Sequence, residues 1–199
     1  MPKSRYPLLK YLLIFGLIIT TDHLSAQTFK GGLVAGFNLS QLDGDKLSGF
    51  NKIGMNAGAR VSADLTERWA FSVQLLYGQQ GSSRTRDDDP NSIYDKIRLN
   101  MVEAPLLIHF SDWKFELDGG FSYSRIINYK VTDYTGIDIS DNENYRPDVF
   151  SLLLGVTFWQ NETIGWNFRW VRGLNDLRNV HGDNRLIGRT ISLRLYYML

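Results

Sequence analysis

Charged side chains occur in several segments of the chain whose other residues are mainly apolar or small. Such groups can form ion pairs and charge-assisted hydrogen bonds, which are strong when donor and acceptor are held in place. An isolated buried charge is costly, so charges on an enclosed face need partners. We predict one polar network, with a gated pathway or a ligand site as the alternatives, from Arg60, Asp64, Glu103, Glu116, Asp118, Arg169 and Arg194.

One member of this set is separated from a proline by a single residue. Glu103 and Pro105 lie among apolar neighbours. Proline cannot donate a hydrogen bond to a neighbouring strand, so within a sheet it is found at edges and bulges. We therefore predict a β-bulge or a local kink at Pro105.

Signals for catalysis or for a metal centre are weak. The chain has no cysteine and three histidines, His23, His109 and His181. No serine, histidine and carboxylate are expected to converge, so we predict no enzyme activity, no cofactor and no metal site. A lipid-modifying membrane enzyme is the alternative. Acidic runs at 87–89 and 141–144 could bind Ca²⁺, but they match no calcium-loop spacing and are interpreted as solvated loop residues.

The elements that position these groups are indicated by alternation. Trp166, Phe168 and Trp170 alternate with Asn167 and Arg169. Successive side chains of a strand point to opposite faces, so a period of two predicts a strand. The same pattern predicts eight strands, at about 28–40, 52–66, 69–83, 96–110, 113–131, 148–159, 162–173 and 186–199.

The connections between these strands alternate in length. Tight turns are expected near 66–68, 111–112 and 160–162. Loops rich in Asp, Asn, Gly and Ser, which favour irregular backbone, are expected at about 41–51, 84–95, 132–147 and 175–185. In an antiparallel arrangement the tight turns and both termini therefore lie at one end, and the long loops lie at the other.

Residues 1–26 have the three-part pattern of a secretory signal peptide. Lys3, Arg5 and Lys10 precede an apolar run over 12–19, and Ala26 ends a short segment typical of a cleavage site. We predict export and cleavage after Ala26, with an uncleaved anchor as the alternative, and one β-barrel domain over 27–199. The formal net charge of the chain is +1, which does not favour a nucleic-acid partner.

Two architectures fit eight alternating strands in an exported chain. A soluble lipocalin-like carrier holds an apolar ligand inside its barrel, whereas an outer-membrane barrel turns its apolar face to lipid. The polar face is rich in Gly, Ser, Thr and Asn, which suits the crowded interior of a small barrel. Together with the unequal connections, this predicts an all-β, eight-stranded antiparallel up-and-down transmembrane β-barrel, monomeric, in the outer membrane of a Gram-negative bacterium. The soluble periplasmic carrier is the alternative.

Aromatic residues gather beside the predicted tight turns, as in the interfacial girdle of a membrane barrel. The residues assigned to this girdle are Trp69, Phe71, Phe110, Trp113, Phe115, Phe158, Trp159 and Trp166. On the same interpretation Trp166, Phe168 and Trp170 face lipid, while Asn167 and Arg169 face the barrel interior.

Three arginines on lipid-facing positions form a separate set, Arg125, Arg172 and Arg189, which we call the rim arginines. They lie about ten residues from the tight turns, so we expect them near the outer rim of the barrel. A guanidinium forms paired hydrogen bonds with phosphate, so we predict contact with lipopolysaccharide. Snorkelling of the side chains toward lipid headgroups is the alternative.

Three short segments resemble the PorT-like family of outer-membrane β-barrel proteins. Residues 32–40 (GLVAGFNLS) resemble the first strand of that family, and residues 102–108 (VEAPLLI) resemble its L-E-I-P-L-L strand, with Ala104 where Ile is usual. Residues 168–176 (FRWVRGLND) are similar to a strand end of the form R-Y…G-L-x-N/D. The resemblance spans the chain after residue 26.

The resemblance implies an outer-membrane location more directly than a role. Some PorT-like members are needed for a protein-secretion and gliding system of Gram-negative bacteria, and most have no assigned activity. We therefore expect a structural or interaction role, or an accessory role in an envelope or secretion complex. The expected partners are outer-membrane lipid, lipopolysaccharide and other envelope proteins.

Overall fold

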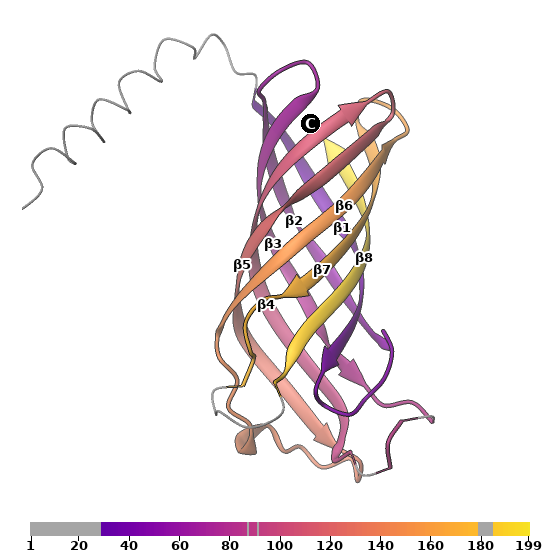
Figure 1. The fold of residues 1–199 in the computed structure, drawn as a ribbon, viewed down its shortest axis with the longest axis vertical. Coiled ribbons are helices and arrows are strands. Elements are labelled where there is room, and N and C mark those ends of the chain that lie inside the picture. The colour runs from indigo at the N-terminus through magenta and orange to yellow at the C-terminus, as the bar shows by residue number, and fades with distance from the viewer. Residues whose placement is uncertain (1–28, 87, 91, 179–184) are drawn as a thin grey trace, which may run out of the picture.

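The computed structural model describes residues 29–86, 88–90, 92–178 and 185–199. These residues form a closed barrel of antiparallel strands in sequence order, which confirms the predicted fold class (Figure 1). The predicted signal peptide lies outside the described residues. No helix in the described part of the chain is long and apolar enough to cross a membrane. The strands are β1 (Phe29–Asp43), β2 (Lys52–Asp64), β3 (Trp69–Ser83), β4 (Tyr94–Asp112), β5 (Phe115–Asp133), β6 (Asp148–Trp159), β7 (Ile164–Gly173) and β8 (Ile187–Met198).

Each strand pairs with the next, and β1 also pairs with β8, so the sheet has no free edge. Ala35 of β1, for example, pairs with Ala57 of β2 on one side and with Leu195 of β8 on the other. Figure 1 shows the short connections and the C-terminus at the upper end of the barrel, and the long loops at the lower end. We call these the turn end and the loop end.

The apolar face of the strands is on the outside. Large apolar side chains that remain exposed include Leu33, Phe37, Leu75, Leu106, Phe121, Leu154, Phe168 and Leu193, which come from seven different strands. Small and polar residues at the alternate positions are buried. A soluble protein would not expose a continuous apolar wall of this extent, whereas lipid covers it in a membrane barrel.

Aromatic rings line the outside of the turn end, with one exception. Trp69 contacts Phe110 at 5.0 Å between ring centroids, and Phe115 contacts Phe158 at 5.4 Å. Trp159 points into the barrel instead, because it follows the outward-facing Phe158 and successive residues alternate. Its assignment to the girdle is therefore wrong.

Strand β4 is continuous through Pro105. The β4–β5 register runs past the Pro105–Ser122 pair without a shift, so the predicted bulge at Pro105 is wrong. The missing N–H of Pro105 affects the edge of β4 that faces β3. There the β3–β4 pairing is interrupted between Leu106 and Glu103. The two register shifts between β4 and β5 lie nearer the loop end, between Tyr94 and Lys96 and between Asn100 and Met101.

The loop end has an apolar interior of its own, which alternation did not predict. Its residues come from the ends of the strands and from the folded-over loops: Leu42, Leu47, Tyr94, Ile97, Leu99, Met101, Ile126, Val131, Tyr145, Val149, Leu177 and Leu186. The face of β4 that is polar at Glu103 becomes apolar toward its start. The strands thus extend into a packed cap beyond the polar part of the barrel.

Buried carboxylates hold two of the loops together at this cap. Asp88 accepts hydrogen bonds from the backbone N–H groups of Thr85 at 2.6 Å and Ser48 at 2.7 Å, and Ser92 donates to the carbonyl of Asp45 at 3.0 Å. Burial opposes the ionisation of Asp88, but the two N–H donors hold its pKa below the usual range. The oxygens of Asp88 are thus buried and occupied by protein donors, so its interpretation as a solvated loop residue is wrong. Asp87 lies outside the described residues.

The cap makes a prediction about stability. Leu99→Ala is expected to destabilise the folded barrel by about 2–5 kcal/mol, because the buried leucine leaves a cavity. Leu106→Ala on the same strand is the matched control, since Leu106 is half exposed on the lipid-facing side. The temperature at which the folded band is lost in heat-modifiable gel migration measures both. Equal shifts for the two variants would contradict a packed cap.

Candidate functional site

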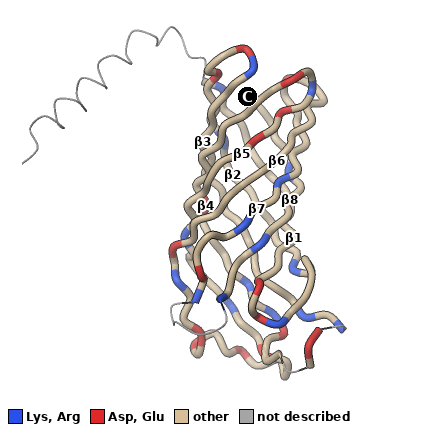
Figure 2. Tube along the Cα trace, in the orientation of Figure 1, with Lys and Arg blue, Asp and Glu red and all other residues tan. Residues whose placement is uncertain are grey.

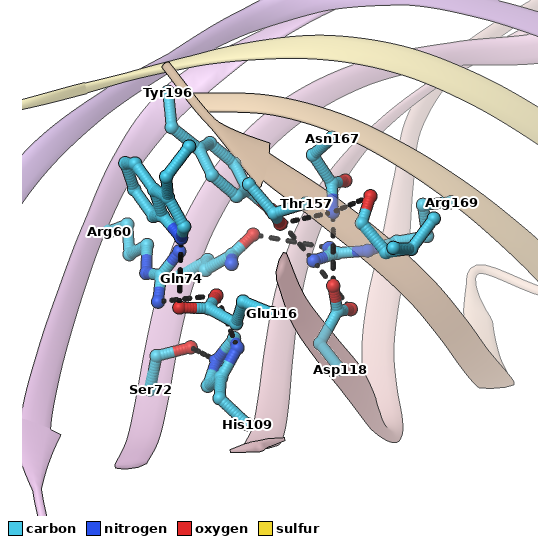
Figure 3. A network of polar contacts seen from close by, with 12 residues as sticks. Arg60, Ser72, Gln74, His109, Glu116, Asp118, Thr157, Asn167, Arg169 and Tyr196 are labelled. Atoms are coloured by element: carbon cyan, nitrogen blue, oxygen red, sulfur yellow. Dashed lines mark hydrogen bonds and ion pairs between the residues drawn. The ribbon is translucent and has the colours of Figure 1, made fainter. Parts of the chain in front are cut away.

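The candidate site is the barrel interior, or lumen, near the turn end (Figure 3). Its first ion pair joins Arg60 of β2 to Glu116 of β5, with Nη2 and Oε1 3.1 Å apart. The guanidinium of Arg60 also lies over the rings of Tyr196 and Trp159, at 5.0 and 5.9 Å from their centroids. The rings and the carboxylate together compensate a cation that has lost nearly all contact with water.

Glu116 is the centre of a longer chain of contacts. The indole Nε1 of Trp159 donates to Glu116 Oε2 at 3.3 Å, and His109 Nδ1 lies 2.8 Å from Oε1. The other ring nitrogen of His109, Nε2, lies 2.6 Å from Ser72 Oγ. Together with the ion pair to Arg60, these contacts link side chains of five strands, β2 to β6, through the carboxylate of Glu116.

A second ion pair lies beside the first. Arg169 Nη2 of β7 is 3.0 Å from Asp118 Oδ1 of β5, and neither side chain has any exposed surface. Arg169 also donates to Gln74 Oε1 at 3.3 Å and to the hydroxyl of Tyr196 at 2.8 Å. Asn167 donates to Asp118 Oδ2 at 3.0 Å. Figure 3 shows these side chains reaching toward one another from opposite walls of the barrel.

Two further members of the predicted network lie in the lumen without such a pair. Arg194 is buried, and its Nη2 donates a hydrogen bond to Ser192 Oγ at 3.3 Å. Glu103 is buried as well, and its charge interacts with those of Arg169 and Arg194. The lumen therefore holds three arginines and three carboxylates from the predicted set, and their formal charges cancel.

Two glycines make room for this network. A Cβ atom on Gly155 would lie 2.6 Å from a carboxylate oxygen of Asp118, and one on Gly165 would lie 2.7 Å from the ring of Trp159. Real Cβ atoms do not approach other atoms so closely. The small residues that alternate with apolar ones along these strands are therefore needed for the large polar side chains opposite them.

Asp64 does not belong to the lumen network, which corrects the prediction. It is the last residue of β2, at the rim of the turn end, and its side chain is half exposed. Its partner is Lys30 on the neighbouring strand, at 2.7 Å. The residue has the inward parity of the strand, but the barrel wall ends there and the carboxylate reaches solvent.

A second correction concerns the histidine. The expectation that no serine, histidine and carboxylate converge is wrong, because Ser72, His109 and Glu116 form a hydrogen-bonded series of the kind that activates a nucleophile in hydrolases. Ser72 and His109 are both fully buried. A substrate cannot reach a hydroxyl that has no exposed surface, and Glu116 is also engaged by Arg60. The series therefore serves as part of the packed interior.

The rim arginines lie on the outside near the loop end, but they do not form one cluster. Arg125 pairs with Asp148 at 3.2 Å, and Arg189 pairs with Asp43 at 2.6 Å. Arg172 and Arg189 are direct register partners on β7 and β8, whereas Arg125 lies on β5, with β6 in between. Within the described part of the chain, Arg172 makes no ion pair.

The remaining charges lie mainly at the two ends of the barrel. Figure 2 shows residues of both signs gathered among the loops at the lower end, with others at the turns of the upper end. No group of three or more His, Cys, Asp or Glu side chains that could hold a metal ion occurs among the described residues.

These features define a class of protein. A closed barrel with an apolar exterior, aromatic rings at its turn end and a charged, buried interior is a transmembrane barrel of the outer-membrane type. The sequence matches the family described as outer membrane protein beta-barrel domain over residues 25–179, and the chain belongs to that family. Membership implies the outer membrane of a Gram-negative bacterium.

Solved structures with a similar fold come from the same class. Neisserial surface protein A is 12% identical, with a TM-score of 0.51 over 85% of this chain and 96% of that protein. Ail, the attachment invasion locus protein of Yersinia pestis, is 11% identical, with a TM-score of 0.49 over 86% and 99%. OprG from Pseudomonas aeruginosa is 12% identical, with a TM-score of 0.40 over 86% and 94%. None of the curated proteins matches the sequence. At these identities the likeness concerns the fold.

The lumen network makes a prediction about stability. Asp118→Ala leaves the buried Arg169 without its carboxylate and is expected to cost about 3–5 kcal/mol. Asp112→Ala removes an exposed carboxylate 3.9 Å from Arg68 and is expected to cost at most about 1 kcal/mol. Urea unfolding in detergent, followed by tryptophan fluorescence, measures both. Similar losses for the two variants would show that the buried pair does not stabilise the barrel.

Proposed function

We propose that this protein is a monomeric, non-conducting membrane anchor that presents its long loops as a fixed platform outside the outer membrane. The observation that carries the proposal is the filling of the interior. Buried ion pairs occupy the lumen near the turn end, and an apolar core occupies it at the loop end. A water-filled pathway through the barrel would require both the ion pairs and the apolar core to be disrupted. The ion pairs are stabilised by charge pairing and the core by packing.

The loops themselves support the platform role. Leu47, Tyr145, Leu177 and Leu186 come from the connections between strands and are buried in the cap. The hydroxyl of Tyr94 donates to Glu143 Oε1 at 2.7 Å, which ties the third long loop to β4. A surface held in this way can bind a partner without first losing conformational freedom.

The partner that we propose is another envelope protein, with the barrel acting as an accessory of an envelope or secretion complex. This part of the proposal is supported by the resemblance to the PorT-like proteins. Co-purification from outer membranes in mild detergent, followed by mass spectrometry, tests it. The proposal fails if the wild-type barrel and a variant with shortened loops recover the same proteins.

A filled lumen predicts an electrical result. The purified protein in planar bilayers is expected to show no steady conductance above the bare membrane, because buried ion pairs and an apolar core occupy the interior. The double variant Arg169→Ala/Asp118→Ala removes one complete ion pair and leaves space in the lumen. Its conductance is compared with that of the wild-type protein. A large, steady conductance from the wild-type protein would overturn the proposal.

The rim arginines are proposed to contact lipopolysaccharide phosphates. Arg172 carries most of this proposal, because it is exposed and has no ion pair in the described chain, while Arg125 and Arg189 each share a carboxylate. The triple variant Arg125→Ala/Arg172→Ala/Arg189→Ala is expected to co-purify with several-fold less lipopolysaccharide. Quantifying lipid phosphate per mole of folded protein measures the effect. An unchanged amount would contradict specific contact and leave ordinary snorkelling.

A further inference from the structure

A second basic surface lies on the outer wall formed by β4 and β5. Arg98 of β4 and Lys130 of β5 are direct register partners, and Lys96 lies two residues before Arg98. Arg98 and Lys130 are exposed, and Lys96 is half buried. We call these three residues the distal basic patch.

Lys96 and Arg98 have no acidic register partners on the neighbouring strands. The register partners of Arg98 and Lys96 on β3 are Gly81 and Ser83, and the partner of Lys96 on β5 is Thr132. Carboxylates are therefore absent from the positions where cross-strand compensation would occur. Glycine at position 81 also leaves one side of the arginine without a neighbouring side chain.

Electrostatics make this arrangement costly in isolation. Like charges directly opposite each other in an antiparallel pair are destabilising. Lys130 has a carboxylate of Asp138 at 3.4 Å, but neither Arg98 nor Lys96 makes an ion pair with a described residue. Both also repel the buried ammonium group of Lys52 on β2. An anion from outside the chain would offset this repulsion between positive charges.

Two of the rim arginines show the same arrangement on β7 and β8, three strands away in the closed order. Arg172 and Arg189 are also like-charged register partners, with one member paired to a carboxylate and the other without an ion pair in the described chain. In the closed order of the sheet, β4 lies halfway around the barrel from β8. Two half-compensated pairs of cations therefore face outward on different parts of the wall near the loop end.

The two surfaces lie at different distances from the bilayer. Lys130 is five residues beyond Arg125 along β5, toward the loop end. At about 3.3 Å per residue and a tilt of about 40°, this places the distal basic patch roughly 10 Å farther from the bilayer centre. With the rim arginines at the phosphates next to the acyl chains, as proposed above, the distal basic patch is at the level of the sugars.

We infer that Lys96, Arg98 and Lys130 bind a phosphate carried on the sugar core of an outer-leaflet lipopolysaccharide. The inference rests on the proposed lipopolysaccharide contact and deepens it by adding a second site, specific for a different part of the molecule. The planar guanidinium of Arg98 offers two parallel N–H donors to phosphate oxygens, and the two ammonium groups add charge. The rim arginines meet the phosphates next to the acyl chains.

The test compares three double variants of the full-length protein, purified in detergent. Lys96→Ala/Arg98→Ala removes the two cations of the distal basic patch that have no ion pair with a described residue, and Arg172→Ala/Arg189→Ala removes the nearer pair. Arg68→Ala/Lys114→Ala removes the same number of charges at the turn end and is the matched control. The probes are lipid A with its phosphates, lipopolysaccharide with a phosphorylated core, and lipopolysaccharide whose core lacks phosphate.

The expected result separates the two sites. Lys96→Ala/Arg98→Ala weakens binding of the core-phosphorylated probe roughly tenfold and leaves binding of the other two probes unchanged. Arg172→Ala/Arg189→Ala weakens binding of all three probes, and the control variant binds like the wild type. Heat-modifiable migration verifies folding of each variant, and Lys96→Gln/Arg98→Gln replaces the alanine pair if that pair misfolds.

Two outcomes overturn the inference and leave the proposed contact between the rim arginines and lipopolysaccharide unaffected. Unchanged binding of the core-phosphorylated probe by Lys96→Ala/Arg98→Ala removes the distal site. An equal loss for core-phosphorylated and core-dephosphorylated probes shows that phosphate is not the ligand. Unchanged binding by Arg172→Ala/Arg189→Ala, with the distal variant impaired, refutes the rim contact and leaves the distal site in place.

Discussion

The pairing of β1 with β8 is the constraint on which the rest of the structure depends. A bilayer offers no water to unpaired N–H and C=O groups, so a sheet that crosses it must close on itself. Closure with eight strands leaves an interior only as wide as its side chains. That width brings Arg60 within reach of Glu116 and Arg169 within reach of Asp118, and it requires glycine at positions 155 and 165.

The same closure explains why an arrangement that resembles a catalytic relay is buried inside the barrel. Ser72, His109 and Glu116 occupy neighbouring strands at inward positions, so the ladder alone places them in contact. In a hydrolase the serine faces a cleft, whereas here it faces a filled interior. Hydrogen bonding at this position satisfies buried polar groups, which would otherwise destabilise the barrel. The function that we propose therefore lies on the outer wall and the loops.

Much of the fold was predictable because a period of two is a strong local signal. Alternation identified all eight strands, the unequal connections and the inward direction of Arg60, Glu103, Glu116, Asp118, Arg169 and Arg194. It failed where the regular barrel wall ends. Asp64 has inward parity but lies at the rim, and Ile97 and Leu99 belong to an apolar cap that forms only when distant loops fold over the strands. Trp159 shows that parity outweighs residue type, because this tryptophan lies beside a tight turn and still points inward.

The sequence by itself determined which residues share a face, because side-chain direction along a strand follows from the backbone alone. Composition and the asymmetry of the connections then indicated that the apolar face is the outer one. Only the tertiary structure decided which charges meet, since partners across a closed barrel depend on strand tilt and register, which local patterns do not encode. The pairing of Arg169 with Asp118, the burial of His109, and the juxtaposition of Arg98 with Lys130 are properties of that closed geometry.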